Sequence, residues 1–396
     1  MLQAKLKNGK VLTLYQYSSQ DIDRLRNMDF YCPTCEERVI MKAGSKIIPH
    51  FAHYSKSNCP ASEGGEGAYH EKGKLLLFNW LLSQGLNVSL ETYIRDINQR
   101  ADILLTINKK KIAIEYQCTK IPIKEILNRT EGYLDYQIQP IWILGANQFH
   151  RRSNNQITVN AFHLQLLHQF KEFNLPALFF YDPQTNTFIQ ATNLIHINSK
   201  SMFGTFSMKK LHHLTFIDLF RHQTVTKDLV LKEWKNAKHA FRLYQPKRLY
   251  GKELIWYRWL YSKGVHREHL PSIVYLPVKS QYRMNTPLWN WQSRICLDVI
   301  SPLRVGAKFS VHRCHFQLRQ SMSTNQFPLI QSSYDPILEY LQLLCSLNYI
   351  KPISKNEFVK CREIVTFSHI EDALAGDELL MNELSKISKT KYEHFS

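Results

Sequence analysis

The sequence predicts an α/β protein of the α+β kind, with a core in the order helix, three strands, helix, strand. Two short apolar segments, residues 100–105 and 112–117, are joined by a polar turn and predict a β-hairpin. Patterns of helical and strand period lie on both sides of this hairpin. These flanking elements are a helix at residues 69–82, a strand at 88–93, a helix at 123–136 and a strand at 140–144.

Each strand of the hairpin carries one acidic residue, Asp102 in the first and Glu115 in the second. If both side chains point to the same face, the register of the hairpin sets them close together. Such carboxylates repel each other unless a divalent cation lies between them, and hard cations such as Mg²⁺ take oxygen ligands. The pair predicts a metal-dependent nuclease, in which the ion polarises a phosphodiester and lowers the pKa of a bound water. The alternative is two exposed carboxylates, but a charge inside an apolar strand is costly unless it is paired.

A second group of metal-ligand residues lies upstream. Cys32 and Cys35 form a Cys-x2-Cys pair, which presents two thiolates to one tetrahedral zinc ion. The second pair comes from His50, His53 and Cys59. We predict a structural Zn²⁺ site of Cys32, Cys35, His53 and Cys59, with His50 as the alternate ligand, because His50 and His53 on an extended segment face opposite sides. A redox Cys-x2-Cys motif is the alternative, but no thioredoxin-like pattern follows it.

The order of the core elements resembles the PD-(D/E)XK superfamily, which has a restriction-endonuclease-like αβββαβ core. This resemblance implies that Asp102 and Glu115, on the second and third strands, bind Mg²⁺ or Mn²⁺. Gln117 stands where the motif has Lys, and it would orient the attacking water or the metal. The missing ammonium group would come from Lys74 or Lys120.

His70 and Lys74 lie one turn apart on the first predicted helix, so both side chains can point toward the cleft. In some nucleases of this superfamily a His on this helix is an additional metal ligand, which makes His70 a candidate ligand. The other interpretation is a His at a helix start that hydrogen-bonds a loop.

Six motifs follow one another within about the first 150 residues: Cys32-Pro33-Thr34-Cys35, Pro49-His50-Phe51-Ala52-His53, Glu63-Gly64-Gly65-Glu66-Gly67, His70-x3-Lys74, Arg100-Ala101-Asp102 and Glu115-Tyr116-Gln117. In these motifs the chain resembles the competence protein CoiA family of naturally transformable Gram-positive bacteria. The resemblance implies a cytoplasmic protein that handles incoming DNA near the recombination step, with DNA, single-stranded or branched, and a recombinase as partners.

The composition agrees with a polyanionic partner. The chain has 51 Lys and Arg against 33 Asp and Glu, a formal net charge of +18. Residues 201–270 contain 14 Lys or Arg and 5 Asp or Glu. Within them Lys232, Lys235 and Arg242 line one face of an amphipathic helix, which predicts a surface that follows DNA phosphates. The aromatic residues at 256–261 offer stacking surfaces for unpaired bases, unless they belong to the core.

The helix at residues 123–136 is expected to flank the active site. Its predicted buried stripe is Ile123, Ile126, Leu127, Thr130 and Leu134. This leaves Lys124, Arg129 and Tyr133 nearer the cleft or solvent, and Arg129 is predicted to contact a backbone phosphate. The alternative is that Arg129 pairs with Glu125 or Glu131 on the same helix.

The length predicts three parts: a zinc-knuckle module to residue 60, a nuclease-like domain at 61–150, and a basic C-terminal region at 151–396 that begins with short strands and becomes mainly helical. Its tail, residues 371–383, is acidic and expected to be exposed. No stretch is long and apolar enough for a membrane span, and the scattered cysteines fit a reducing cytoplasm. Two functions remain: a metal-dependent DNA nuclease, or a DNA-binding recombination mediator on a degenerate nuclease fold.

Overall fold

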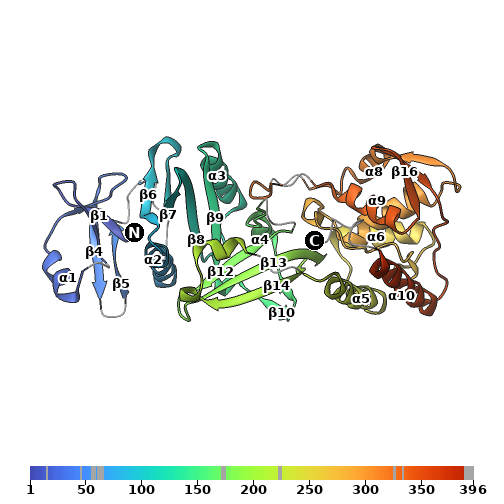
Figure 1. The fold of residues 1–396 in the computed structure, drawn as a ribbon, viewed down its shortest axis with the longest axis horizontal. Helices are drawn as coiled ribbons and strands as arrows, with labels where there is room; N and C mark the ends of the chain where they lie inside the picture. Colours follow the sequence, from blue (N-terminus) through green and yellow to red (C-terminus); the bar gives the residue numbers. More distant parts are fainter. Residues whose placement is uncertain are drawn as a thin grey trace.

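The computed structural model describes residues 1–14, 17–44, 47–54, 59, 67–170, 175–221, 225–323, 327–331 and 334–387. Three parts follow one another along the long axis in chain order: a small sheet, a large central sheet, and a mainly helical part (Figure 1). The Glu- and Gly-rich run at residues 63–66 lies outside the described residues.

The N-terminal part is a five-stranded sheet with the order β2-β1-β3-β4-β5. Its elements are β1 (Gln3–Lys5), β2 (Val11–Thr13), α1 (Ser19–Leu25), β3 (Phe30–Tyr31), β4 (Arg38–Gly44) and β5 (Ile47–His53). Its apolar core is small and includes Phe30, Val39 and Phe51 together with Cys32 and Cys59. A core of this size supplies little stability, so an additional constraint such as a bound metal is expected here.

The central part begins with the predicted order of helix, three strands, helix and strand. Its elements are α2 (Ala68–Leu82), β6 (Asn87–Ile94), β7 (Gln99–Ile107), β8 (Lys110–Gln117), α3 (Ile123–Asp135) and β9 (Ile138–Gly145). The predicted α/β architecture is therefore confirmed, with β7 and β8 forming the hairpin that carries the two acidic residues.

The central sheet does not end near residue 150, where the sequence led us to place a boundary. It has nine strands in the order β10-β11-β14-β13-β12-β9-β8-β7-β6. The added elements are β10 (Arg151–Ser153), β11 (Gln156–Thr158), α4 (Ala161–Gln165), β12 (Leu178–Asp182), β13 (Thr187–Asn198) and β14 (Ser201–Lys210). Strands β8, β9 and β12 are parallel neighbours, so their carboxyl ends meet at one edge of the sheet.

Helices α2 and α3 pack on opposite faces of this sheet. Ile103 and Ile114 share a core with Leu77 of α2, whereas Ile126 of α3 packs against Trp142 on the other face. The buried residues of α3 are Ile126, Thr130 and Tyr133. Tyr133, which was expected to lie nearer the cleft or solvent, is fully buried, and Ile123, Leu127 and Leu134 of the predicted stripe are only partly buried.

The C-terminal part is mainly helical, with a small three-stranded sheet. Its elements are α5 (Lys227–Leu243), α6 (Gly251–Ser262), α7 (Leu288–Arg294), β15 (Lys308–Ser310), α8 (Val311–Leu318), α9 (Pro336–Ser346), β16 (Ile350–Ser354), β17 (Glu357–Lys360) and α10 (Ile370–Lys386). Among the described residues, no helix has the length and apolar character to cross a membrane.

Residues 271–280 form an irregular segment that is buried along its whole length. Buried backbone carbonyls need partners, and here side chains from several helices supply them. Lys238 Nζ donates to the carbonyls of Ser272 and Val274 at 2.8 and 2.7 Å. The Gln292 side-chain amide donates to Leu276 O and accepts from Leu276 N, at 2.8 and 2.7 Å. The basic residues of α5 thus include structural ones.

Helix α10 packs one face against α5, so the acidic tail, which was expected to be exposed, is exposed only on its other face, where Glu371 and Glu378 lie. Arg242 forms a two-pronged ion pair with Asp377 of α10, with N–O distances of 2.8 and 2.9 Å, and is 2 % exposed. This corrects the prediction that Arg242 contacts DNA. Lys235 Nζ pairs with Glu378 at 2.5 Å, and Lys232 is exposed.

Replacing Asp377 with Ala is expected to lower the free energy of unfolding by about 3–5 kcal/mol, because Arg242 and Lys238 then remain buried without their carboxylate. Lys238 Nζ is 3.3 Å from Asp377 Oδ1, and burial lowers the pKa of Lys238 to about 8. Denaturant unfolding measures the change. Glu378→Ala is the matched control, since this neighbouring exposed pair contributes little. Equal stability of the two variants would contradict the assignment.

Candidate functional site

A cleft of about 780 Å³ opens at the edge of the central sheet where the carboxyl ends of β8, β9 and β12 meet. Its walls include Tyr69 and His70 of α2, Gln117 at the end of β8 and Arg129 of α3. Asp182, at the end of β12, lies on the wall and its Oδ1 accepts from the Tyr69 hydroxyl at 3.2 Å. Sheets with parallel strands bind ligands at this edge, so the cleft is the candidate active site.

Asp102 and Glu115 lie on neighbouring strands of the β7–β8 hairpin, each one residue beyond the last pair, Ile103 and Ile114. Strict strand alternation would set both on one face, but the Asp102 carboxylate lies beside His70 and Lys74 of α2, whereas the Glu115 carboxylate lies beside Arg129 and Tyr133 of α3. Beyond this pair the ladder opens, because the Tyr116 backbone N–H donates to Asp102 Oδ2 at 2.9 Å. Both acidic residues are buried, with 4 % and 3 % exposure. The alternative of two exposed carboxylates is therefore wrong.

The Glu115 carboxylate is held by two side chains of α3. Arg129 Nη2 donates to Glu115 Oε2 at 2.5 Å, and the Tyr133 hydroxyl donates to Glu115 Oε1. Burial raises the pKa of Glu115 above its ordinary value, Asp102 adds to this rise, and Arg129 and Tyr133 oppose it. A divalent ion binds the ionised form, so protons compete with metal here up to a higher pH than at an ordinary glutamate.

His70 and Lys74 reach Asp102 from α2. His70 Nε2 lies 3.6 Å from Asp102 Oδ2, and Lys74 Nζ lies 3.7 Å from Asp102 Oδ1. Gly73 makes this approach possible, because a Cβ at this position would lie 2.0 Å from the Tyr116 ring. The His70 ring stacks on the same tyrosine, with ring centroids 5.6 Å apart. The sequence predicted the two residues but gave no reason to single out Gly73.

Of the two lysines that the sequence left open, Lys74 is the one at the carboxylates, and Lys120 is exposed. Lys74 is fully buried, and its Nζ also lies 2.7 Å from Glu91 Oε1 and 3.5 Å from Glu71 Oε2. Sequence reasoning missed Glu91 and Glu71. The signal for Glu91 was present, since it is an acidic residue within the predicted strand at 88–93, as Glu115 is within its strand.

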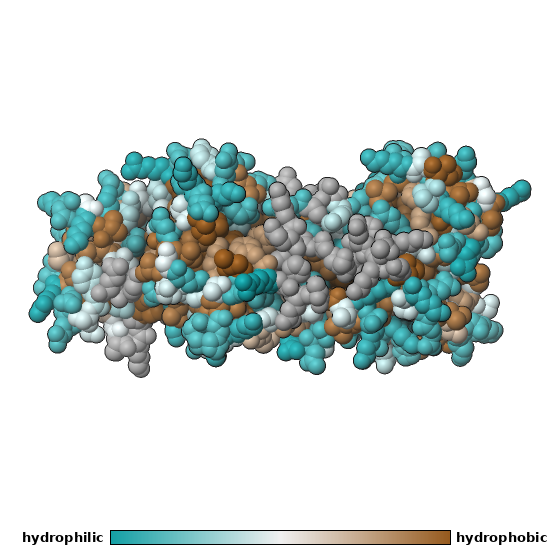
Figure 2. Space-filling view, in the orientation of Figure 1, coloured by the Kyte–Doolittle hydropathy of each residue, from teal (hydrophilic) through white to brown (hydrophobic). Residues whose placement is uncertain are grey.

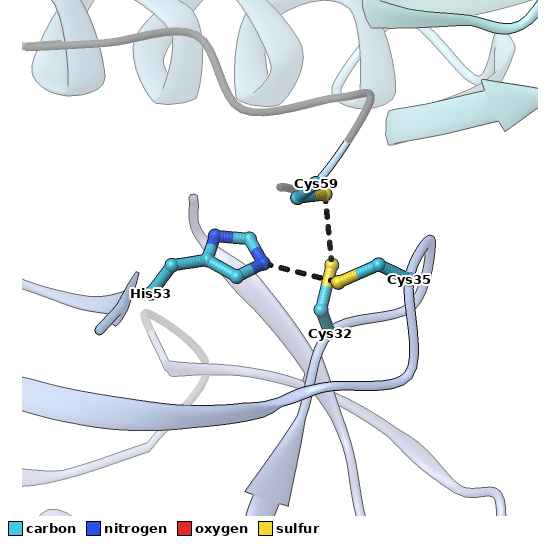
Figure 3. Close-up of side chains that lie close together, drawn as sticks. All are labelled: Cys32, Cys35, His53 and Cys59. Atoms are coloured by element: carbon cyan, nitrogen blue, oxygen red, sulfur yellow. Dashed lines mark hydrogen bonds between the residues drawn. The ribbon is translucent and has the colours of Figure 1, made fainter. Parts of the chain in front are cut away.

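Cys32, Cys35, His53 and Cys59 lie together, as the spacing predicts (Figure 3). Their ligand atoms all lie within 4.8 Å of one another, and no other such cluster of three or more occurs among the described residues. The Cys32 and Cys59 sulfurs are 3.8 Å apart, and Cys35 Sγ is 3.3 Å from His53 Nε2. A tetrahedral zinc ion with Zn–S bonds of about 2.3 Å separates its ligands by about 3.8 Å, so this cluster can hold zinc.

The alternate ligand His50 lies outside this cluster. Its Nδ1 contacts the Ile48 carbonyl at 2.9 Å. Burial lowers the pKa of His53, which favours the neutral imidazole that binds metal, and burial raises the pKa of the Cys35 thiol to about 12. The thiol would lose its proton on binding zinc.

Three family models match the chain in succession. They describe the N-terminal domain of competence protein CoiA at residues 14–62, its nuclease-like domain at 66–224 and its C-terminal domain at 229–374. Competence protein CoiA of Bacillus subtilis (strain 168) is 27 % identical over 374 residues, which cover 91 % of this chain and 97 % of that protein. No solved structure matches. The order of the three domains, with the cleft in the nuclease-like one, shows that this chain belongs to the competence protein CoiA family.

Proposed function

We propose that the chain is a metal-dependent DNA nuclease that hydrolyses phosphodiesters of incoming or recombining DNA during natural transformation. The observation that supports this most is the approach of a buried Lys74 to Asp102, with the buried Glu115 on the next strand, beside an open cleft. The match of residues 66–224 to a nuclease-like domain agrees with it. A structural role alone gives no reason to bury this many charges at the edge of a cleft.

Asp102 and Glu115 would hold Mg²⁺ or Mn²⁺, with His70 as a third ligand. The donor types fit, because two buried carboxylates lie on neighbouring strands and the His70 Nε2 lies 3.6 Å from Asp102 Oδ2. Metal binding would have to draw these ligand atoms closer together, since they do not form a cluster as tight as that of the cysteines and His53. The bound ion would polarise the phosphodiester and lower the pKa of a water. Lys74 supplies the ammonium group that the motif has in the place of Gln117.

Gln117 lies on the cleft wall, and its Nε2 donates to the Thr119 carbonyl at 2.8 Å. This bond fixes the side-chain amide while its carbonyl can orient a water. In this assignment Gln117 positions the attacking water and carries no charge.

Arg129→Ala is expected to weaken DNA binding on all sequences alike and to shallow the salt dependence by about one unit of slope, because a phosphate contact carries no sequence information. Arg129 lies on the cleft wall, where its guanidinium can extend from Glu115 to a phosphate. Binding measured at several salt concentrations tests this, with the exposed Lys124→Ala on the same helix as control. An unchanged slope of the salt dependence would mean that Arg129 pairs with Glu115 and does not contact a phosphate.

The test of the proposed function is an assay of the purified wild-type protein with Mn²⁺ on single-stranded, duplex and branched DNA. Cleavage that needs the added metal supports the nuclease. Tight binding without cleavage of any of these substrates overturns the nuclease and favours a mediator that assists a recombinase.

The mediator is the second candidate, and the exposed aromatic residues at helix α6 are the feature that it would use. Trp256 is buried, so it is core rather than a stacking surface. Tyr250 and Tyr261, by contrast, are 75 % and 85 % exposed, near exposed Arg258 and Lys252. Apolar side chains interrupt the hydrophilic surface of this helical part (Figure 2). Exposed aromatic rings with neighbouring positive charge suit the stacking of unpaired bases, so α6 would bind single-stranded DNA in either function.

A further inference from the structure

Glu91 joins the N-terminal sheet to the candidate active site. One of its carboxylate oxygens, Oε1, accepts from Lys74 Nζ at 2.7 Å. The other, Oε2, accepts from the backbone N–H groups of Leu2 and Gln3 at 2.7 and 3.1 Å. One side chain therefore connects the start of β1 with the lysine beside Asp102.

The contacts of Glu91 with Lys74 and with Leu2 are protected from water. Lys74 and Leu2 are fully buried, and Glu91 is 6 % exposed. Leu2 packs in the core of the central sheet rather than in the core of its own sheet. Hydrogen bonds to charged groups are stronger than neutral ones, and they are stronger still where water is excluded. The position of Lys74 thus depends on the position of β1.

The backbone of Glu91 has a φ of +48°, in the left-handed region that an L-residue adopts at a cost. Its two neighbours in β6, Leu90 and Thr92, pair with Ile103 and Ala101 of β7. This local irregularity turns the Glu91 side chain toward α2. Strained backbone of this kind is retained where the surrounding structure or a function requires it.

Strand β1 is in turn held by the zinc-binding segment. Lys5 pairs with Tyr31 of β3, and Cys32, the first residue of the Cys/His cluster, follows directly. A continuous path therefore runs from the cluster through β3 and β1 to Glu91 and then to Lys74. Packed strands and paired hydrogen bonds are the kind of network that can transmit a change between sites.

We propose that Glu91 is a positioning residue that sets Lys74 against Asp102, and that it makes the geometry of the active site depend on the folded zinc-binding domain. This inference rests on the proposed nuclease function. The zinc-binding domain is then a structural part of the active site, and zinc supports cleavage without taking part in the chemistry.

The test is Glu91→Gln. A glutamine side chain has one oxygen that accepts hydrogen bonds and an NH2 group that only donates. It therefore cannot accept from Lys74 Nζ on one side and from the β1 backbone N–H groups on the other, as the two carboxylate oxygens of Glu91 do. The kcat of Mn²⁺-dependent cleavage is expected to fall about 10-fold or more, while KM and zinc content stay unchanged. Glu36→Gln is the matched control, because Glu36 pairs with Lys5 of the same strand on the exposed side. Wild-type kcat in Glu91→Gln would overturn the inference.

Chelation of zinc separates this path from a general loss of stability. Removing zinc should lower the kcat of the wild type, but it should lower the kcat of Glu91→Gln little further, because the two changes break the same path. Independent, additive losses would overturn the proposal.

If the wild type does not cleave DNA, the proposed function fails, and hydrogen exchange decides the inference instead. Zinc removal must then deprotect the amides of α2 around Lys74, and unchanged protection would refute it.

Discussion

Cleavage by Asp102→Asn in the presence of Mn²⁺ is expected to fall by more than about 100-fold, with unchanged affinity for DNA. Residues that only support metal ligands already cost about 10–100-fold when they are replaced, and the loss of a ligand should cost more. The Asn side chain keeps a carbonyl that can accept from the Tyr116 N–H, so the hairpin is expected to fold. The positive surface that attracts DNA is unchanged by the substitution.

The same result is expected for Glu115→Gln, for the same reason. Glu115→Ala would also leave the buried Tyr133 hydroxyl without its acceptor, which costs about 1–3 kcal/mol of stability, so the Gln variant is the cleaner test. Rates of cleavage and binding isotherms are measured on one substrate for both variants.

Asp96→Ala is the control for both variants. Asp96 is an exposed carboxylate in the connection between β6 and β7, and it does not line the cleft. The Asp96→Ala protein should cleave DNA at the rate of the wild type. Full activity in Asp102→Asn or Glu115→Gln would remove that residue from the metal site.

Local sequence patterns predicted the elements that carry the site. The hairpin and its two acids followed from alternation and turn residues, and the zinc cluster followed from the spacing of Cys32, Cys35, His53 and Cys59. In each case the residues that meet are close in sequence or belong to adjacent elements. Short-range rules of period and ligand spacing are sufficient for such contacts.

The partners that the sequence did not give lie far along the chain or on another face. The sequence offered no basis for choosing between Lys74 and Lys120 as the source of the ammonium group. Only the packing of α2 on Tyr116 brings Lys74 to Asp102. Arg129 was expected to pair within its own helix or to contact DNA, yet its observed partner is Glu115 on β8. Helical periodicity defines a face, but it does not identify what that face meets.

The C-terminal region illustrates this limit most clearly. The basic face of α5 was predicted to follow DNA phosphates and the acidic tail to be exposed, because each is strongly charged. In the structure Arg242 and Asp377, 135 residues apart, satisfy each other. Two charged faces that complement each other can be buried together, and no pattern within either segment reveals this pairing.

Loss of bound zinc is the other large expected effect. A Cys32→Ser/Cys35→Ser protein should lose about one equivalent of zinc per chain, and its N-terminal domain should unfold, because the small core around Phe30 and Phe51 cannot replace the metal. Elemental analysis measures the metal, and hydrogen exchange over β1 to β5 measures the unfolding. Cys361→Ser, at a partly buried cysteine outside the cluster, is the matched control and should keep both. Unchanged zinc content in the double variant would refute the site.

The two histidines of β5 provide a more specific test of the zinc site. His53→Ala should release the metal or weaken its binding strongly, because its Nε2 lies 3.3 Å from Cys35 Sγ, whereas His50→Ala should retain one equivalent. Both residues lie on one strand at an odd spacing, so the variants disturb the same backbone but opposite faces. A structural zinc ion with four protein ligands has no open position for substrate. Any loss of cleavage in His53→Ala must therefore reach the active site through the fold, and the contact of β1 with Glu91 is the route that the structure offers.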